Sequence, residues 1–148
     1  MENAFAAFIE RCNLALDSGD PQASVEAVLL DAARDPDIVD AVAERTKFAS
    51  LSDLAIHRSE RLTLLAGTLP PGFVATPHNH NLWSVVGPGV LPNGPDVIHA
   101  ICNPLDEPLL VLHAYGGDLF ATPRSNWDPE THEEIPFDWE KVRSKADA

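Results

Sequence analysis

The stretch Pro71–His80, PGFVATPHNH, decides how this sequence is interpreted. Side chains at i and i+2 of a β-strand point to the same face, so His78 and His80 can aim two imidazoles at one point. Neutral imidazole is a good ligand for iron, zinc, copper and nickel. A third imidazole, His99, ends the apolar segment GPDVIH. We therefore predict a metal site made by His78, His80 and His99.

Helical periodicity precedes this region, and strand-like segments surround it. In residues 1–50, apolar side chains recur at steps of three and four, and the pairs Asp20-Pro21 and Asp35-Pro36 are helix start signals, so three helices are expected. From about residue 51, short apolar runs alternate with proline and glycine, which is typical of strands and turns. Strands are predicted near residues 54–58, 61–69, 74–80, 82–86, 97–102 and 109–115. The proline-punctuated tail is expected to be extended, with Trp127, Phe137 and Trp139 as anchors.

Composition and charge exclude several classes of function. The chain has 148 residues, of which 45% are hydrophobic, and this is enough for one sizeable core. Ten Lys+Arg against 23 Asp+Glu give a net charge of -13, so neither nucleic acid nor an anionic membrane is an expected partner. No apolar run suits a membrane span or a signal peptide, and a cytoplasmic location is therefore expected. Cys12 and Cys102 are both predicted to be buried.

The spacing of glycine and histidine resembles the two sequence motifs of the cupin superfamily. Gly72 lies six residues before the first histidine, Gly87 lies seven after the second, and His99 precedes Asn103 in a His-x-x-x-Asn pattern. The resemblance covers residues 54 to about 127. It implies a mainly β fold with N-terminal helices, in which a double-stranded β-helix forms a small jelly-roll barrel around the metal. The expected single domain, residues 1–148, has helices in 1–50, the barrel in 51–122 and the extended tail in 123–148.

Within that superfamily, the sequence is similar to the thiol dioxygenases, the group that contains cysteine dioxygenase. The usual glutamate of the first motif is replaced, because the segment Trp83–Val85 stands in its place. A three-histidine site without glutamate resembles that of the thiol dioxygenases, which hold Fe(II) and add O2 to a substrate thiolate. Leu112–Tyr115 is similar to their Leu-His-x-Tyr strand, which implies catalytic roles beside the metal for His113 and Tyr115. An arginine on an early strand binds the substrate carboxylate in that group, and Arg58 is the candidate here.

Two departures from the family pattern are visible. Val111 stands where many such enzymes have a serine, so the hydroxyl relay is incomplete. Only 18 residues separate His80 from His99, where cupins usually place a further hairpin. Either Gly87-Pro88-Gly89 joins the flanking strands directly, which exposes a sheet edge and makes a homodimer a candidate assembly, or the sequence omits a native stretch between Gly87 and Gly94.

The resemblance thus implies a mononuclear non-haem iron dioxygenase that oxidises a small thiol to a sulfinate with O2. Two alternatives stay open. One is a cupin that binds a metal or another ligand without catalysis. The other is a cupin enzyme that uses zinc, nickel or manganese in place of Fe(II).

Overall fold

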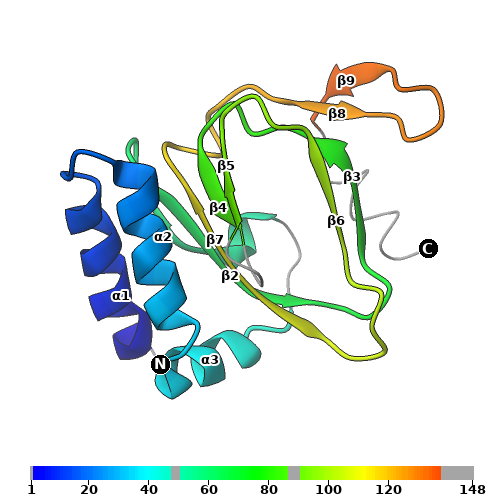
Figure 1. Cartoon of the computed structure of the whole chain (residues 1–148). Coiled ribbons are helices and arrows are strands. Elements are labelled where there is room, and N and C mark those ends of the chain that lie inside the picture. Colours follow the sequence, from blue (N-terminus) through cyan, green and yellow to red (C-terminus); the bar gives the residue numbers. More distant parts are fainter. Residues whose placement is uncertain (1, 48–50, 87–90, 138–148) are drawn as a thin grey trace.

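A computed structural model describes residues 2–47, 51–86 and 91–137 of the chain. Three helices lie against one of two antiparallel β-sheets, and the second sheet lies on the side away from the helices (Figure 1). The structure therefore confirms a mainly β fold with N-terminal helices.

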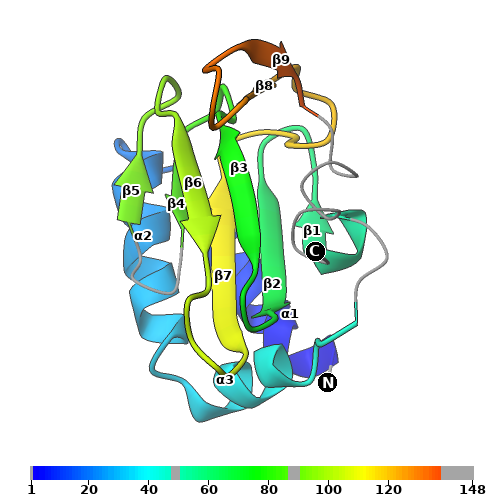
Figure 2. The same ribbon diagram turned by 90° about the vertical axis from the view of Figure 1, so that its right-hand side faces the viewer.

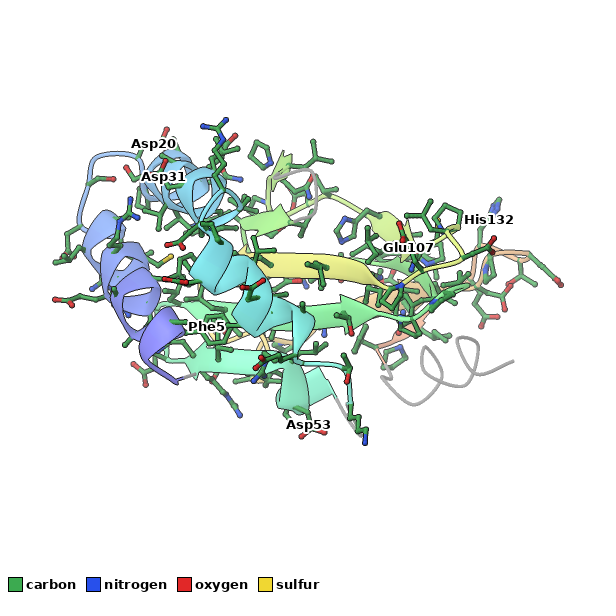
Figure 3. All side chains as sticks on the ribbon, turned by 90° about the horizontal axis from the view of Figure 1, so that it is seen from below. Phe5, Asp20, Asp31, Asp53, Glu107 and His132 are labelled. Atoms are coloured by element: carbon green, nitrogen blue, oxygen red, sulfur yellow. The ribbon has the colours of Figure 1, made fainter. Side chains whose placement is uncertain are left out.

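The helical layer consists of α1 (Glu2–Ala15), α2 (Pro21–Ala32) and α3 (Pro36–Ala43). The second and third helices begin at the predicted signals. The carboxylates of Asp20 and Asp35 accept hydrogen bonds from the backbone N–H groups of Ala23 and Asp37, at 3.1 and 3.0 Å, and a proline follows each cap. Figure 3 shows Asp20 and Asp31 on the outside of this layer. No helix in the described ranges is long and apolar enough to cross a membrane.

A five-stranded sheet lies directly under the helices. A short 3-10 helix, η1 (Leu51–Leu54), leads into it, and the strands run in the order β1 (Ala55–Arg58), β2 (Thr63–Leu69), β7 (Leu109–Tyr115), β4 (Ser84–Val86) and β5 (Leu91–Asn93). Leu64 and Ala66 of β2 belong to the hydrophobic cluster that contains Phe8 and the other buried residues of the helices, whereas Leu65 faces the interior between the sheets. The alternation along β2 thus separates the helix-packing core from the interior that receives the candidate site.

A four-stranded sheet forms the other wall, in the order β6 (His99–Cys102), β3 (Val74–His78), β8 (Ser125–Trp127) and β9 (Glu134–Pro136) (Figure 2). The turn between β2 and β3 depends on Gly72, whose φ of 76° lies in the left-handed region that favours glycine. Asn103 closes the same end of the molecule, because its backbone N–H donates to Phe73 and its backbone carbonyl accepts from Gly72. Both strands that carry predicted ligands are therefore anchored at one end.

All six predicted strands are present in the structure, and three features of the strands and their pairing differ from the prediction. The six predicted strands correspond to β1, β2, β3, β4, β6 and β7. The strand β5 was not predicted, and β4 pairs with it rather than with the strand of His99, which pairs with β3. The tail, which was expected to be extended, forms an additional hairpin, β8–β9. Residues 87–90, which include the whole proposed Gly-Pro-Gly connection, and Trp139 lie outside the described residues.

The two cysteines have different environments. Cys12 is fully buried under the helices, as predicted. The prediction for Cys102 was wrong, because this residue is exposed. Alternation places it on the outer face of the four-stranded sheet, opposite to His99, and the three helices cover the other sheet (Figure 1).

Candidate metal centre

Three histidines from two neighbouring strands converge at one point in the interior. His78 is the last residue of β3, His99 is the first of β6, and the two are direct partners in the antiparallel register. His80 lies just beyond the end of β3. The potential ligand atoms of the three side chains all lie within 4.8 Å of one another, and their ring centroids are 4.8–5.0 Å apart. The predicted group therefore forms, and it could hold a metal ion.

Hydrogen bonds around β3 explain how the second histidine turns into the site. The register of β3 against β6 shifts between Ala75 and His78, where Pro77 provides no backbone N–H. Beyond the strand, Asn79 is tied to Ser125 twice: its backbone N–H donates to the Ser125 carbonyl at 3.1 Å, and its Oδ1 accepts from the Ser125 N–H at 2.8 Å. Since Asn79 is held in this way, His80 is directed back into the interior, where its side chain is buried.

Nitrogen atoms of the group are available to bind a metal. Nδ1 of His78 donates to the Thr76 carbonyl at 2.7 Å, which leaves Nε2 as the lone-pair nitrogen. Nε2 of His99 is buried and has no hydrogen-bond partner among the described residues. An ion that three nitrogens bind at about 2.1 Å holds these nitrogens about 3.0–3.6 Å apart, so side-chain rotations that bring the ligand atoms about 1 Å closer complete the site. The residues therefore fit a divalent ion.

Burial keeps these imidazoles neutral. It lowers the pKa of His78 to about 4, although the bond to the Thr76 carbonyl partly opposes the shift. It also lowers the pKa values of His80 and His99. Because a neutral imidazole is the form that binds metal, protons compete weakly with an ion at neutral pH.

The two residues predicted to act beside the metal lie on β7, and both face the same interior. The ring of Tyr115 lies 4.7 Å from that of His80 between centroids, and it stacks on His113 at 6.3 Å with an interplanar angle of 17°. Nδ1 of His113 is buried without a hydrogen-bond partner in the described part of the chain. Burial lowers the pKa of His113 to about 3 and raises that of Tyr115 to about 12. At neutral pH, both side chains are therefore uncharged.

A small cavity of about 70 Å³ adjoins these rings. His78, His80, His113, Tyr115 and Arg124 form its polar part. The rest of the wall is largely apolar and comes from both sheets and the following loops: Leu54, Leu65, Leu69, Phe73, Ala75, Ile101, Val111, Leu119 and Phe137. A molecule of only a few non-hydrogen atoms fits such a space.

The predicted carboxylate-binding residue, Arg58, lies elsewhere. Its Nε donates to Oδ1 of Asp118 at 2.9 Å, its side chain is 50% exposed, and its guanidinium lies 4.9 Å from the centroid of the Phe120 ring. It is not part of the cavity wall. The structure thus gives Arg58 a surface ion pair, and its role with a substrate stays a prediction.

A different arginine, Arg124, does line the cavity, and it was not predicted from the sequence. Its guanidinium carbon lies 3.5 Å from the centroid of the Phe137 ring. Burial lowers its pKa to about 10, partly opposed by Tyr115, so it remains a cation at neutral pH. One sequence signal could have found it, because Arg124 is the only basic residue between positions 62 and 140.

Comparison with known proteins adds no relative: no protein-family model matches the chain, and no curated protein matches it significantly. The relation to cupins therefore stays a prediction from the motif spacing. What the geometry establishes is a group of three neutral histidines that contains no carboxylate among the described residues. It lies beside a small cavity that one cation also lines.

Proposed function

We propose that this protein is a cupin-type iron enzyme that oxidises a small, anionic thiol to a sulfinate with O2. The observation that carries the proposal is the convergence of His78, His80 and His99 beside a small cavity, with no carboxylate in the group among the described residues. The two-sheet fold around the site is compatible with the small jelly-roll barrel that the sequence motifs imply.

The charge balance of the site favours an anionic substrate. Three neutral imidazoles leave the full double charge of a divalent ion uncompensated, in a cavity whose other lining is mostly apolar. Arg124 adds a further positive charge. A thiolate that binds the ion and a carboxylate that binds the guanidinium would together neutralise the site. The apolar wall of the cavity lowers the local dielectric constant and so strengthens both interactions.

The side chains of the cavity have distinct proposed roles. Arg124 holds the carboxylate and so orients the substrate toward the histidines. Tyr115, uncharged at neutral pH, offers a hydroxyl donor beside His80. His113 stacks on Tyr115 and fixes the orientation of its ring. The apolar wall excludes water and limits the substrate to a small molecule.

The bound metal would supply the redox chemistry that joins O2 to sulfur. The overall reaction balances without a further reductant, since RS⁻ and O2 give RSO2⁻. Two S–O bonds form and the O–O bond breaks. The sulfur is oxidised by four electrons, which O2 accepts.

Metal analysis and oxygen uptake test this proposal together. Protein purified from its native host should contain iron close to one ion per chain and should consume O2 with cysteine or 3-mercaptopropionate, with a sulfinate as the product detected by mass spectrometry. His78→Ala with His80→Ala should lose both metal and turnover. His132→Ala is the matched control, because this exposed histidine lies in the turn at the far end of the β8–β9 hairpin (Figure 3). Full turnover by the double variant would refute the proposal.

A second candidate is a cupin that binds a small molecule without oxidising it. The valine at position 111, which leaves the hydroxyl relay incomplete, favours this alternative. It predicts that the double histidine variant retains its ligand, and that the purified protein consumes no O2 with any small thiol.

A further inference from the structure

The edge strand β6 lacks the features that keep strand edges from pairing. The described strands give four sheet edges. The edge strand β1 carries Arg58 and a register shift, β5 carries Pro92, and β9 carries Glu134 and Pro136. Charges, prolines and bulges at such edges prevent association. The strand β6, with the sequence HAIC, carries neither a charged residue nor a proline, the extra residue of its register shift lies on β3, and no described strand pairs with its second side.

The outer surface next to this edge is apolar. Ala100 and Cys102 of β6 are exposed, as are Ile98 just before it and Val74 on β3. Ile98 is 52% exposed beside the first residue of β6, and Val74, which pairs with Cys102 at the other end of the strand, is 44% exposed. The three helices cover the other sheet, so they leave this surface uncovered (Figure 1).

The charge distribution favours this face for a contact between two copies of the chain. Of the chain's 10 Lys+Arg and 23 Asp+Glu residues, only Asp96 falls between positions 62 and 105, the segment that contains β3 and β6. Exposed acidic residues such as Asp20, Asp31 and Asp53 lie on the helical layer and near η1 (Figure 3). Two molecules that each carry a net charge of -13 repel one another over most of their surfaces, and they can approach without burying a charge through this face.

From these three observations we infer that β6 pairs antiparallel with β6 of a second copy of this chain. A two-fold axis places the same strand on both sides of the contact, so the free backbone groups of each edge meet their equivalents and the apolar surfaces around Ile98 and Val74 become contiguous. The pair of four-stranded sheets would then form one continuous sheet across the axis.

Size-exclusion chromatography with light scattering tests this inference. The wild-type protein should have twice the chain mass of 16.0 kDa at micromolar concentration. Ile98→Asp and Val74→Asp should each weaken the dimer by about a hundredfold, since each substitution adds two like charges to the interface. Leu14→Asp is the matched control, because Leu14 is 66% exposed on α1, in the helical layer. Circular dichroism checks that all three variants are folded, as expected for exposed positions.

Hydrogen exchange then tests the strand pairing itself. The backbone amides of residues 99–102 should exchange more slowly in the wild-type dimer than in the Ile98→Asp monomer. A monomeric wild type would overturn the inference and point to another occupant of the edge. So would a dimer that Leu14→Asp weakens as much as Ile98→Asp does.

Discussion

Asn103 shows how one buried amide fixes the end of both metal-bearing strands. Its side chain is 1% exposed, its Nδ2 donates to the carbonyls of Leu69 at 3.0 Å and Glu107 at 2.8 Å, and its Oδ1 accepts from the N–H of Leu105 at 3.0 Å. The asparagine of the His-x-x-x-Asn pattern is therefore a structural residue that closes the turn after β6.

Replacing Asn103 with alanine should lower the free energy of unfolding by about 2–3 kcal/mol, because it leaves several buried carbonyl and N–H groups without partners. Urea denaturation measures the change. The control is Asp106→Ala, an exposed position in the same turn, which should change stability by less than about 0.5 kcal/mol. Equal effects of the two substitutions would contradict the proposed role of the amide.

Substitution of Arg124 and substitution of Arg58 are expected to affect substrate binding differently. If Arg124 holds the carboxylate, Arg124→Gln should raise KM for cysteine or 3-mercaptopropionate by about tenfold to a hundredfold, the value of one charge-assisted hydrogen-bonded pair. It should change KM little for cysteamine, which has no carboxylate. Arg58→Gln is the matched variant, and steady-state kinetics should show the smaller effect for it. The reverse order would restore the sequence prediction for Arg58.

At the scale of the element, Gly116 lets the end of β7 lie close to Trp83, which directly precedes β4, because glycine has no side chain. The indole ring of Trp83 occupies the space that a Cβ at position 116 would need, and the Gly116 N–H donates to the Trp83 carbonyl at 2.9 Å. Gly116 directly follows Tyr115, so this contact also holds the end of β7 in place.

Gly116→Ala should therefore destabilise the protein by about 1–3 kcal/mol, because a well-packed ring has to shift. Thermal unfolding measures the loss. A matched control is Gly94→Ala, since no atom lies within 4 Å of a Cβ at that position. The interpretation would fail if both alanine variants had the wild-type Tm.

The sequence predicted the elements whose signals are local. Each of α2 and α3 begins with an aspartate cap and a proline, and the histidine spacing identified all three members of the metal group. The strand β5 was missed because Pro92 breaks the strand pattern in a three-residue segment, and pairing to β4 overrides that signal. Arg124 was missed because only the tertiary fold brings the residue before β8 to the cavity.

At the scale of the whole molecule, several histidines are buried in their neutral form, and this makes the stability of the metal-free protein depend on pH. The pKa of His78 is about 4 when folded and about 6.5 in the unfolded reference, and burial lowers the pKa of His113 to about 3. Between these values, the unfolded chain binds more protons than the folded one. The contribution of these neutral histidines to the free energy of unfolding is therefore complete above about pH 6.5 and is lost as the pH falls toward 4.

Chelator-treated protein should accordingly unfold at progressively lower urea concentration as the pH is lowered from about 6.5 to about 4. His113→Phe should reduce this dependence, because it removes one buried group that must be protonated on unfolding. His132→Gln, an exposed control, should leave the dependence unchanged. An equally steep acid response of all three proteins would show that His113 does not contribute to it.

In the proposed dimer, the position of β6 couples ion binding by His99 to the association of two copies of the chain. His99 reaches the interior from a strand that only one described neighbour holds, while the opposite side of the same strand faces outward. An ion bound by His99 would order β6 and so favour pairing of its free edge with a second copy. Pairing of that edge would in turn order β6 and favour ion binding by His99. By thermodynamic reciprocity, loading of the ion and self-assembly should then strengthen each other to the same degree.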